Sequence, residues 1–192
     1  MAVWNEHEIS PGVWRSNQPT PRRIRLWADR GIKTVVNLRN ESPKAWYALE
    51  ADACARFGVE LVNFAARSRA APEKAWFHDV KALFAQVEPP FVMHCKSGAD
   101  RAGLMSALYL LIAQNRPVEE AAAQLSWRYL HVRQGKTGIL DFLIDEYARS
   151  NALHSMSFLD WVDERYDPTA LRAAFQPAPL ADFVVDRVLR RE

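Results

Sequence analysis

Short apolar runs alternate along the chain with longer segments whose apolar residues recur at helical spacing. The runs occupy residues 12–19, where a short strand ends in a turn, and residues 32–38, 59–64 and 91–94. The run at 32–38 is β-branched and nearly continuously apolar, which is typical of a strand covered on both faces. The intervening segments predict helices over residues 21–30, 43–57, 73–86 and 104–113. This order predicts an α/β fold, a three-layer domain with a mainly parallel central sheet of about four to five strands flanked by helices.

The C-terminal third of the sequence predicts further helices, over residues 115–130 and 138–152. We expect residues 1–152 to form one domain. Residues 153–192 predict a helical C-terminal extension that packs on the same domain. Its aromatic and aliphatic residues have helical spacing, with interruptions at 167–168 and 177–179: Phe158, Leu159, Trp161, Val162, Tyr166, Leu171 and Phe175.

Composition narrows the class of protein. Of 192 residues, 49% are hydrophobic and 25% are charged, with a net charge of +2. This usage is ordinary for a globular protein and lacks the basic excess of a nucleic-acid-binding protein. The first residues have no signal-peptide pattern, and the longest apolar stretch, 104–113, is too short to span a bilayer. We therefore expect a cytoplasmic protein without stable membrane insertion.

The cysteines argue against a disulfide framework and against a metal site. Cys54 and Cys95 are the only two, and neither has a companion set of metal-spaced ligands. We expect no metal and no cofactor. Cys54 is expected in the core, with a regulatory disulfide to Cys95 as the alternative. Cys95 is left as a candidate nucleophile.

Residues 92–103 carry the chemistry. Cys95 follows a predicted buried strand, and Arg101 stands six positions later at the start of a helix. A loop of this length between strand and helix can turn successive backbone amides inward, and the helix dipole adds positive charge at the same point. An arginine offers a planar fork for two phosphoryl oxygens. In such surroundings the pKa of a thiol falls from about 8.5 to roughly 3.5–7.5, which predicts a thiolate nucleophile aimed at phosphorus.

In these residues the chain resembles the cysteine-dependent protein tyrosine phosphatase superfamily, whose signature is His-Cys, five residues, Arg. His94, Cys95, Gly98 and Arg101 occupy the signature positions. The segments Trp14-Arg-Ser-Asn-Gln-Pro19 and Val35-Val-Asn-Leu-Arg39 are similar to bacterial dual-specificity-like phosphatases. The resemblance covers residues 12–152. It implies the cysteine phosphatase fold, a phosphocysteine intermediate and no metal.

The resemblance also implies a role for each signature residue. Cys95 is the expected nucleophile, Arg101 the expected ligand of the transition state, and His94 a supporting residue that orients the loop. The phosphate is expected to bind the loop made by Lys96, Ser97, Gly98, Ala99, Asp100 and Arg101.

Two departures from the family pattern affect the mechanism. Many members supply a general acid from a loop after the third strand, but residues 65–74 contain no Asp. We expect Asp100 to be the acid, as in members with an Asp directly before the loop Arg; the alternatives are the Glu73 and Asp79 region or an unaided leaving group. Ala102 stands where many members have Ser or Thr, so we expect slow breakdown of the phosphoenzyme.

The substrate is less defined than the reaction. Arg39, Arg67, Arg69 and Lys136, together with Lys96, could form a basic ring around the phosphate site. The sequence is compatible with phosphotyrosine, phosphoserine or phosphothreonine protein and with inositol phosphates or phosphoinositides. Two other readings stay open: a catalytically weak module that recognises phosphorylated partners, and a rhodanese-like sulfurtransferase, which also has a cysteine in a short anion-binding loop.

Overall fold

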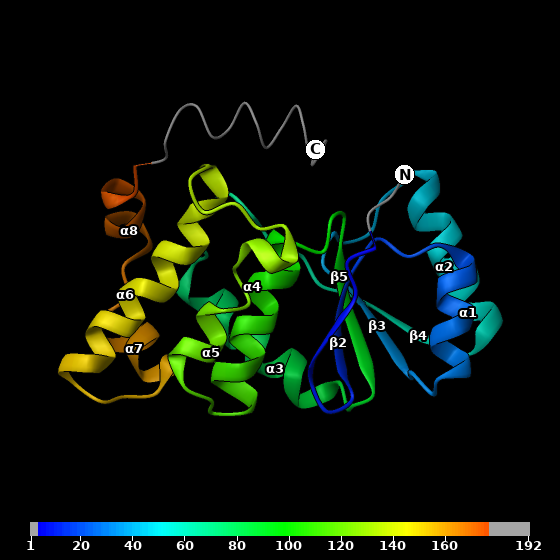
Figure 1. Cartoon of the computed structure of the whole chain (residues 1–192), viewed down its shortest axis with the longest axis horizontal. Helices are drawn as coiled ribbons and strands as arrows, with labels where there is room; N and C mark the ends of the chain where they lie inside the picture. The colour runs from blue at the N-terminus through cyan, green and yellow to red at the C-terminus, as the bar shows by residue number, and fades with distance from the viewer. Residues whose placement is uncertain (1–3, 177–192) are drawn as a thin grey trace. The chain divides into compact units, whose positions relative to one another are not determined.

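A computed structural model describes residues 4–176. It contains a five-stranded sheet in the order β1-β2-β5-β3-β4 (Figure 1). The strands are β1 (His7–Ser10), β2 (Val13–Asn17), β3 (Thr34–Asn37), β4 (Glu60–Asn63) and β5 (Phe91–Cys95). The β1–β2 pair is antiparallel and the other pairs are parallel. This confirms the predicted α/β fold with a mainly parallel sheet.

The chain divides into two compact units. The first comprises the residues up to Ala66 together with Val87–Ala102, and the second comprises Arg67–Gln86 together with the residues from Gly103 onward. The first unit holds the whole sheet with α1 (Pro21–Asp29) and α2 (Ala45–Phe57). Thr20 caps α1 as predicted, since its side chain accepts a hydrogen bond from the backbone of Arg23.

Apolar side chains from α1, α2 and the sheet form the core of the first unit. The fully or nearly fully buried members are Ile24, Trp27, Ile32, Val35, Ala53, Cys54, Val59 and Val92. Their spacing in α1 and α2 matches one helical face, while Val35 and Val92 lie on neighbouring strands. Burial of this face fixes both helices against the sheet.

Strand register determines where the site forms. β5 lies between β2 and β3, with Asn17 opposite Cys95 and Asn37 opposite His94. These parallel strands therefore end at the same edge of the sheet. In open α/β sheets this carboxyl edge is where ligands bind.

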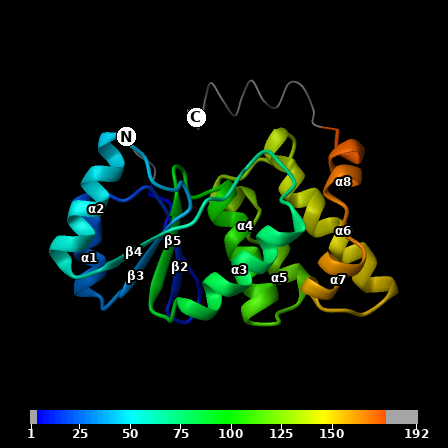
Figure 2. The ribbon, with the colours of Figure 1, turned by 180° about the vertical axis from the view of Figure 1, so that it is seen from behind.

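The second unit is helical within the described residues. It contains α3 (Lys74–Gln86), most of α4 (Asp100–Leu108), α5 (Val118–Ala122), α6 (Ile139–Leu153), α7 (Phe158–Glu164) and α8 (Pro168–Ala174). α7 contacts both α3 and α6 (Figure 2). Aromatic rings fill this contact: Phe77, Tyr147, Phe158, Trp161 and Tyr166.

The helices of the second unit differ in part from the prediction. The helix expected at 115–130 ends at Ala122, because Ser126 is extended and Leu130 is in the left-handed region. The apolar helix expected at 104–113 begins at Asp100 and continues beyond Leu108 as a π-helical turn, Tyr109–Ala113. Up to Ala174 the C-terminal extension is helical as predicted, and residues 177–192 lie outside the described part.

Within residues 4–176, none of the helices combines the length and the apolar character that a membrane span requires.

Candidate active site

The candidate nucleophile lies at the carboxyl edge of the sheet. Cys95 is the last residue of β5, and Asp100 is the first residue of α4, so residues 96–99 form the connecting loop. The thiol residue is 2% exposed and Asp100 is 7% exposed. The predicted order of strand, short loop and helix is therefore present.

Four consecutive carbonyls of this loop are held on one side. Lys96 O accepts from the backbone of Gln18 at 3.2 Å, and Ser97 O accepts from Asn5 Nδ2 at 2.9 Å. Gly98 O and Ala99 O both accept from Arg15 Nη2, at 2.8 and 2.9 Å. Because the two polar groups of a trans peptide point in opposite directions, the amides of residues 97–100 are turned away from these donors, and the Ala99 amide donates to Ser97 Oγ at 3.4 Å. This row of amides, at the N-terminus of α4, is an anion-binding arrangement.

Gly98 makes this loop conformation attainable. Its φ is +74°, and a Cβ there would lie 2.7 Å from the backbone nitrogen of Asn17 and 2.8 Å from the carbonyl carbon of Ser16. A side chain would therefore be strained by its φ and would collide with backbone that cannot move aside easily. The glycine of the signature is required by the close approach of β2.

A buried carboxylate orients the histidine next to the nucleophile. His94 Nε2 lies 2.5 Å from Glu50 Oε1, and both residues are buried. Since a carboxylate only accepts, Nε2 carries the hydrogen of this bond. Glu50 Oε2 accepts from Gln18 Nε2 at 2.7 Å. These two hydrogen bonds of Glu50 therefore connect α2 with β5 and with the segment after β2.

Arg39 belongs to the same edge. Its Nη1 donates to Gln18 Oε1 at 2.5 Å, and its guanidinium carbon lies 3.5 Å from the centre of the Trp46 ring. Burial and the charge of Arg101 lower the pKa of Arg39, while the charges of Cys95 and Glu50 raise it. The two arginines and the cysteine therefore share one electrostatic environment.

The cations at this edge are not neutralised by ion pairs. Among the residues that the structure describes, no carboxylate lies within ion-pair distance of Arg39, Lys96 or Arg101. Positive charge beside a row of amides is suited to a phosphoryl group. The structure thus brings together Cys95, Arg39 and Arg101, with Lys96 and Asp100 at the two ends of the same loop.

The remaining members of the predicted basic ring, Arg67, Arg69 and Lys136, lie in the second unit. The alternative acids also lie there. Glu73 is 3.2 Å from Arg172 in an ion pair, and Asp79 is an exposed residue of α3.

Cys54 is a core residue, as expected. It is 1% exposed within the core of the first unit, and both cysteines are free thiols. Burial and the charge of Glu50 raise the pKa of Cys54 to about 12. Across residues 4–176 no cluster of His, Cys, Asp and Glu suited to a metal ion occurs.

Four polar residues that support the loop were missed by sequence reasoning: Asn5, Arg15, Gln18 and Glu50. Two of them carried a usable signal. Arg15 lies on the same inward face of β2 as Val13. Glu50 lies on the same face of α2 as Ala53 and Cys54. A charged residue at an inward position indicates a buried polar contact.

Comparison with known proteins places this site in a family. The model of the family PTP-NADK, described as "DSP-PTPase phosphatase fused to NAD+ Kinase", matches residues 3–138. The dual specificity protein phosphatase TpbA of Pseudomonas aeruginosa UCBPP-PA14 is 30% identical over 121 residues, which are 63% of this chain and 53% of TpbA. The chain thus spans about half the length of the curated relatives it matches.

Solved structures have the same fold. A crystal structure of P. aeruginosa TpbA aligns with a TM-score of 0.56 at 21% identity, over 89% of this chain and 90% of that chain. The structure of PTPMT1 aligns with a TM-score of 0.54 at 23% identity, over 78% and 99% of the two chains. Because the family match includes the entire loop between Cys95 and Arg101, this chain belongs to the DSP-PTPase phosphatase family PTP-NADK, within the cysteine-dependent protein tyrosine phosphatase superfamily.

Proposed function

We propose that this chain hydrolyses phosphomonoesters through a phosphocysteine intermediate. The observation that carries the proposal is the row of amides over residues 97–100, which lies between the thiol of Cys95 and the cation of Arg101. Such a row binds three phosphoryl oxygens and leaves the phosphorus open to attack from the strand end. A sulfurtransferase or a pure recognition module would not need a general acid beside the arginine.

The reaction follows from this arrangement in two displacements. The thiolate of Cys95 attacks phosphorus, an S–P bond forms, and the P–O bond to the leaving group breaks as Asp100 gives its proton to that oxygen. A water then attacks phosphorus, Asp100 takes a proton from it, and the S–P bond breaks to release inorganic phosphate and thiolate. Arg101 and the loop amides balance the charge on the phosphoryl oxygens in both steps.

The position of Asp100 supports its assignment as the acid. Asp100 is the first residue of α4, next to Arg101 and directly after the loop. The alternative acid Glu73 forms an ion pair with Arg172 instead. The backbone N–H of Asp100 belongs to the row of amides at the proposed phosphate site. We infer from this position that its carboxyl group can serve the ester oxygen of a bound substrate.

The first experiment is hydrolysis of p-nitrophenyl phosphate and of an alkyl phosphate across pH, with vanadate as inhibitor. We expect Cys95→Ser to abolish both activities. We expect Asp100→Asn to keep most of the first-turnover rate on the aryl ester, whose leaving group needs no acid, and to lose about 100-fold or more of that rate on the alkyl ester. Equal losses on the two esters would contradict the role of Asp100. No turnover by folded wild type would contradict the proposed hydrolase and favour the binding module, or the sulfurtransferase if thiosulfate is consumed.

The relatives differ in what their descriptions say they bind or act on. TpbA has been crystallised with phosphotyrosine, and the yeast protein SIW14 is described as a PP-IP phosphatase. In this chain Arg39 and Lys96 provide positive charge beyond that of Arg101, which favours esters with a second anionic group. We expect Arg39→Met to raise KM for an inositol polyphosphate more than KM for p-nitrophenyl phosphate; an equal change in both would remove this preference.

Ala102 is expected to limit the second displacement. It is fully buried and has no hydroxyl group to assist the leaving thiolate. With p-nitrophenyl phosphate we expect a burst of about one nitrophenol per active site, followed by a slower steady rate. Ala102→Ser should raise the steady rate. The absence of a burst, or an unchanged rate in Ala102→Ser, would contradict slow phosphoenzyme breakdown.

A further inference from the structure

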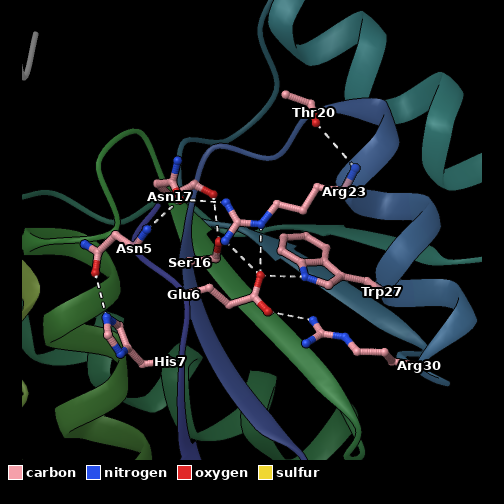
Figure 3. A network of polar contacts seen from close by, with 9 residues as sticks. All are labelled: Asn5, Glu6, His7, Ser16, Asn17, Thr20, Arg23, Trp27 and Arg30. Atoms are coloured by element: carbon pink, nitrogen blue, oxygen red, sulfur yellow. Dashed lines mark hydrogen bonds and ion pairs between the residues drawn. The ribbon is translucent and has the colours of Figure 1, made fainter. Parts of the chain in front are cut away.

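We propose that Asn5 is a positioning residue for the phosphate-binding loop, held in place by a polar network that extends to α1. The inference rests on the proposed function, because it assigns a role in forming the oxyanion site. Figure 3 shows the network, which runs from the segment before β1 through the end of β2 to α1. All of its residues belong to the first unit.

The side chain of Asn5 contacts the loop directly. Asn5 is 2% exposed, and its Nδ2 donates to Ser97 O at 2.9 Å. Its Oδ1 lies 3.1 Å from Nε2 of His7. Since Oδ1 can only accept, His7 donates, and this bond fixes which end of the amide faces the loop. The same Nδ2 lies 3.0 Å from the position that a Cβ on Gly98 would occupy.

The backbone of Asn5 is anchored to β2. Its N–H donates to Asn17 Oδ1 at 3.2 Å, and Arg23 Nη1 donates to the same oxygen at 2.7 Å. Asn17 lies opposite Cys95 in the sheet register. The segment is therefore fixed to the strand that borders the nucleophile.

Glu6 ties the same segment to α1. Its Oε2 accepts from Arg23 Nε at 2.9 Å and from Trp27 Nε1 at 2.8 Å, and its Oε1 accepts from Arg30 at 2.6 Å. Charge-assisted bonds of this kind are shorter and stronger than neutral ones. With donors from two residues of α1 and from its C-cap Arg30 on a single carboxylate, Glu6 fixes the position of its neighbour Asn5.

The bond from Asn5 selects one orientation of a peptide group that can otherwise rotate. The peptide between Ser97 and Gly98 presents its carbonyl to Asn5 and its amide to the opposite side. Glycine tolerates positive and negative φ almost equally, so this peptide could flip at little intrinsic cost. A flip would turn a carbonyl oxygen toward the bound anion. By holding Ser97 O, Asn5 keeps the Gly98 amide available to phosphate.

The test compares Asn5→Ala and Asn5→Asp with Glu8→Ala. Glu8 lies in the same N-terminal segment and accepts a hydrogen bond from the backbone of Gly12 at 3.0 Å, without contacting the loop. The readouts are kcat and KM for p-nitrophenyl phosphate, the dissociation constant of tungstate from calorimetry, and the thermal unfolding midpoint.

We expect Asn5→Ala to lower kcat about tenfold and to weaken tungstate binding by a comparable factor, as for loss of one oriented hydrogen bond. Asn5→Asp, which has nearly the same shape, should lose more, because a carboxylate oxygen would face Ser97 O. Glu8→Ala should stay within twofold of wild type in kcat and tungstate affinity.

The proposal is overturned if Asn5→Ala and Asn5→Asp keep the wild-type kcat and tungstate affinity, or lose activity only in proportion to the unfolded fraction. Should Asn5→Ala fail to fold, the near-isosteric Asn5→Asp decides the question by the same two readouts. Wild type that binds tungstate but hydrolyses no ester would contradict the proposed function alone. The tungstate affinities of the Asn5 variants would then still test the positioning role.

Discussion

Gly98 leaves no room for a side chain in the loop. A Cβ there would lie 2.7 Å from the nitrogen of Asn17 at a φ of +74°. We expect Gly98→Ala to fold and to lose about 100-fold or more in kcat/KM for p-nitrophenyl phosphate, because the amides must shift from the anion. Gly58→Ala is the matched control, with φ +68° and nothing within 4 Å. It should lose about 1 kcal/mol of stability and keep its kcat. An active Gly98→Ala would refute the steric argument.

The two cysteines are predicted to differ in reactivity. With its pKa raised to about 12, Cys54 is a thiolate to about one part in ten thousand at pH 8. We expect iodoacetamide at pH 8 to alkylate Cys95 and to leave Cys54 unmodified, as read by peptide mass spectrometry. Vanadate should protect Cys95. In Cys95→Ser the label should appear only after unfolding in urea, and rapid labelling of the folded variant would contradict the raised pKa of Cys54.

At the scale of single residues, the sequence identified the candidate reactive residues but not the polar side chains that hold the loop in place. Cys95 and Arg101 were recognisable because their spacing is short and local. Arg15, Asn5 and Glu50 act on residues 44 to 92 positions away, through contacts that exist only after the sheet has formed. The sequence indicates a buried polar contact for Arg15 and Glu50, but not which group each one contacts, because that depends on how the strands and α2 pack.

At the scale of elements, the strongest periodic patterns were predicted well and the short or irregular ones were not. The run at 32–38 and the helix from Pro21 are recovered with small changes at their ends. β1 was missed because its four residues include His7 and Glu8 and pair at the sheet edge with an irregular register. The helix expected at 115–130 was too long because no local signal marks the left-handed Leu130.

The attachment of the segment before β1 to α1 is predicted to weaken in acid. Burial raises the pKa of Glu6, but hydrogen bonds from Arg30, Trp27 and Arg23 outweigh it and hold the pKa below its ordinary value of 4.5. A carboxylate with a lowered pKa stabilises the folded state fully above the unfolded value and loses that contribution as pH falls through the folded value. We therefore expect the thermal midpoint to fall below about pH 4.5 more steeply in wild type than in Glu6→Gln.

The control for Glu6 is Asp52→Asn. Asp52 pairs with Arg56 at 2.9 Å, but both side chains are more than half exposed, so the pair should contribute little. Its midpoint should follow that of wild type across the same pH series in circular dichroism. If Glu6→Gln also follows wild type, the acid sensitivity does not originate in this attachment.

At the scale of the whole molecule, the candidate catalytic groups and the aromatic cluster belong to different compact units. In the first unit, apolar side chains pack between the sheet and the helices α1 and α2, and polar contacts hold the loop of residues 96–99. The second unit relies on rings from α3, α6 and α7, where Phe158 lies 5.5 Å from Phe77 and 5.1 Å from Tyr147 between ring centres. The chemistry of the loop and the apolar burial of the second unit can therefore be perturbed separately by mutation.

Phe158→Ala tests the aromatic cluster. Phe158 is 2% exposed, and removing a buried ring leaves a cavity whose creation typically lowers stability by about 3–5 kcal/mol. That loss is a large share of the stability of an ordinary domain, about 5–15 kcal/mol. We expect the urea midpoint, followed by tryptophan fluorescence, to fall steeply. Leu153→Ala removes a large apolar side chain that is 78% exposed and should change stability by less than about 0.5 kcal/mol. Equal effects of the two substitutions would mean that the rings around Phe158 do not stabilise the second unit.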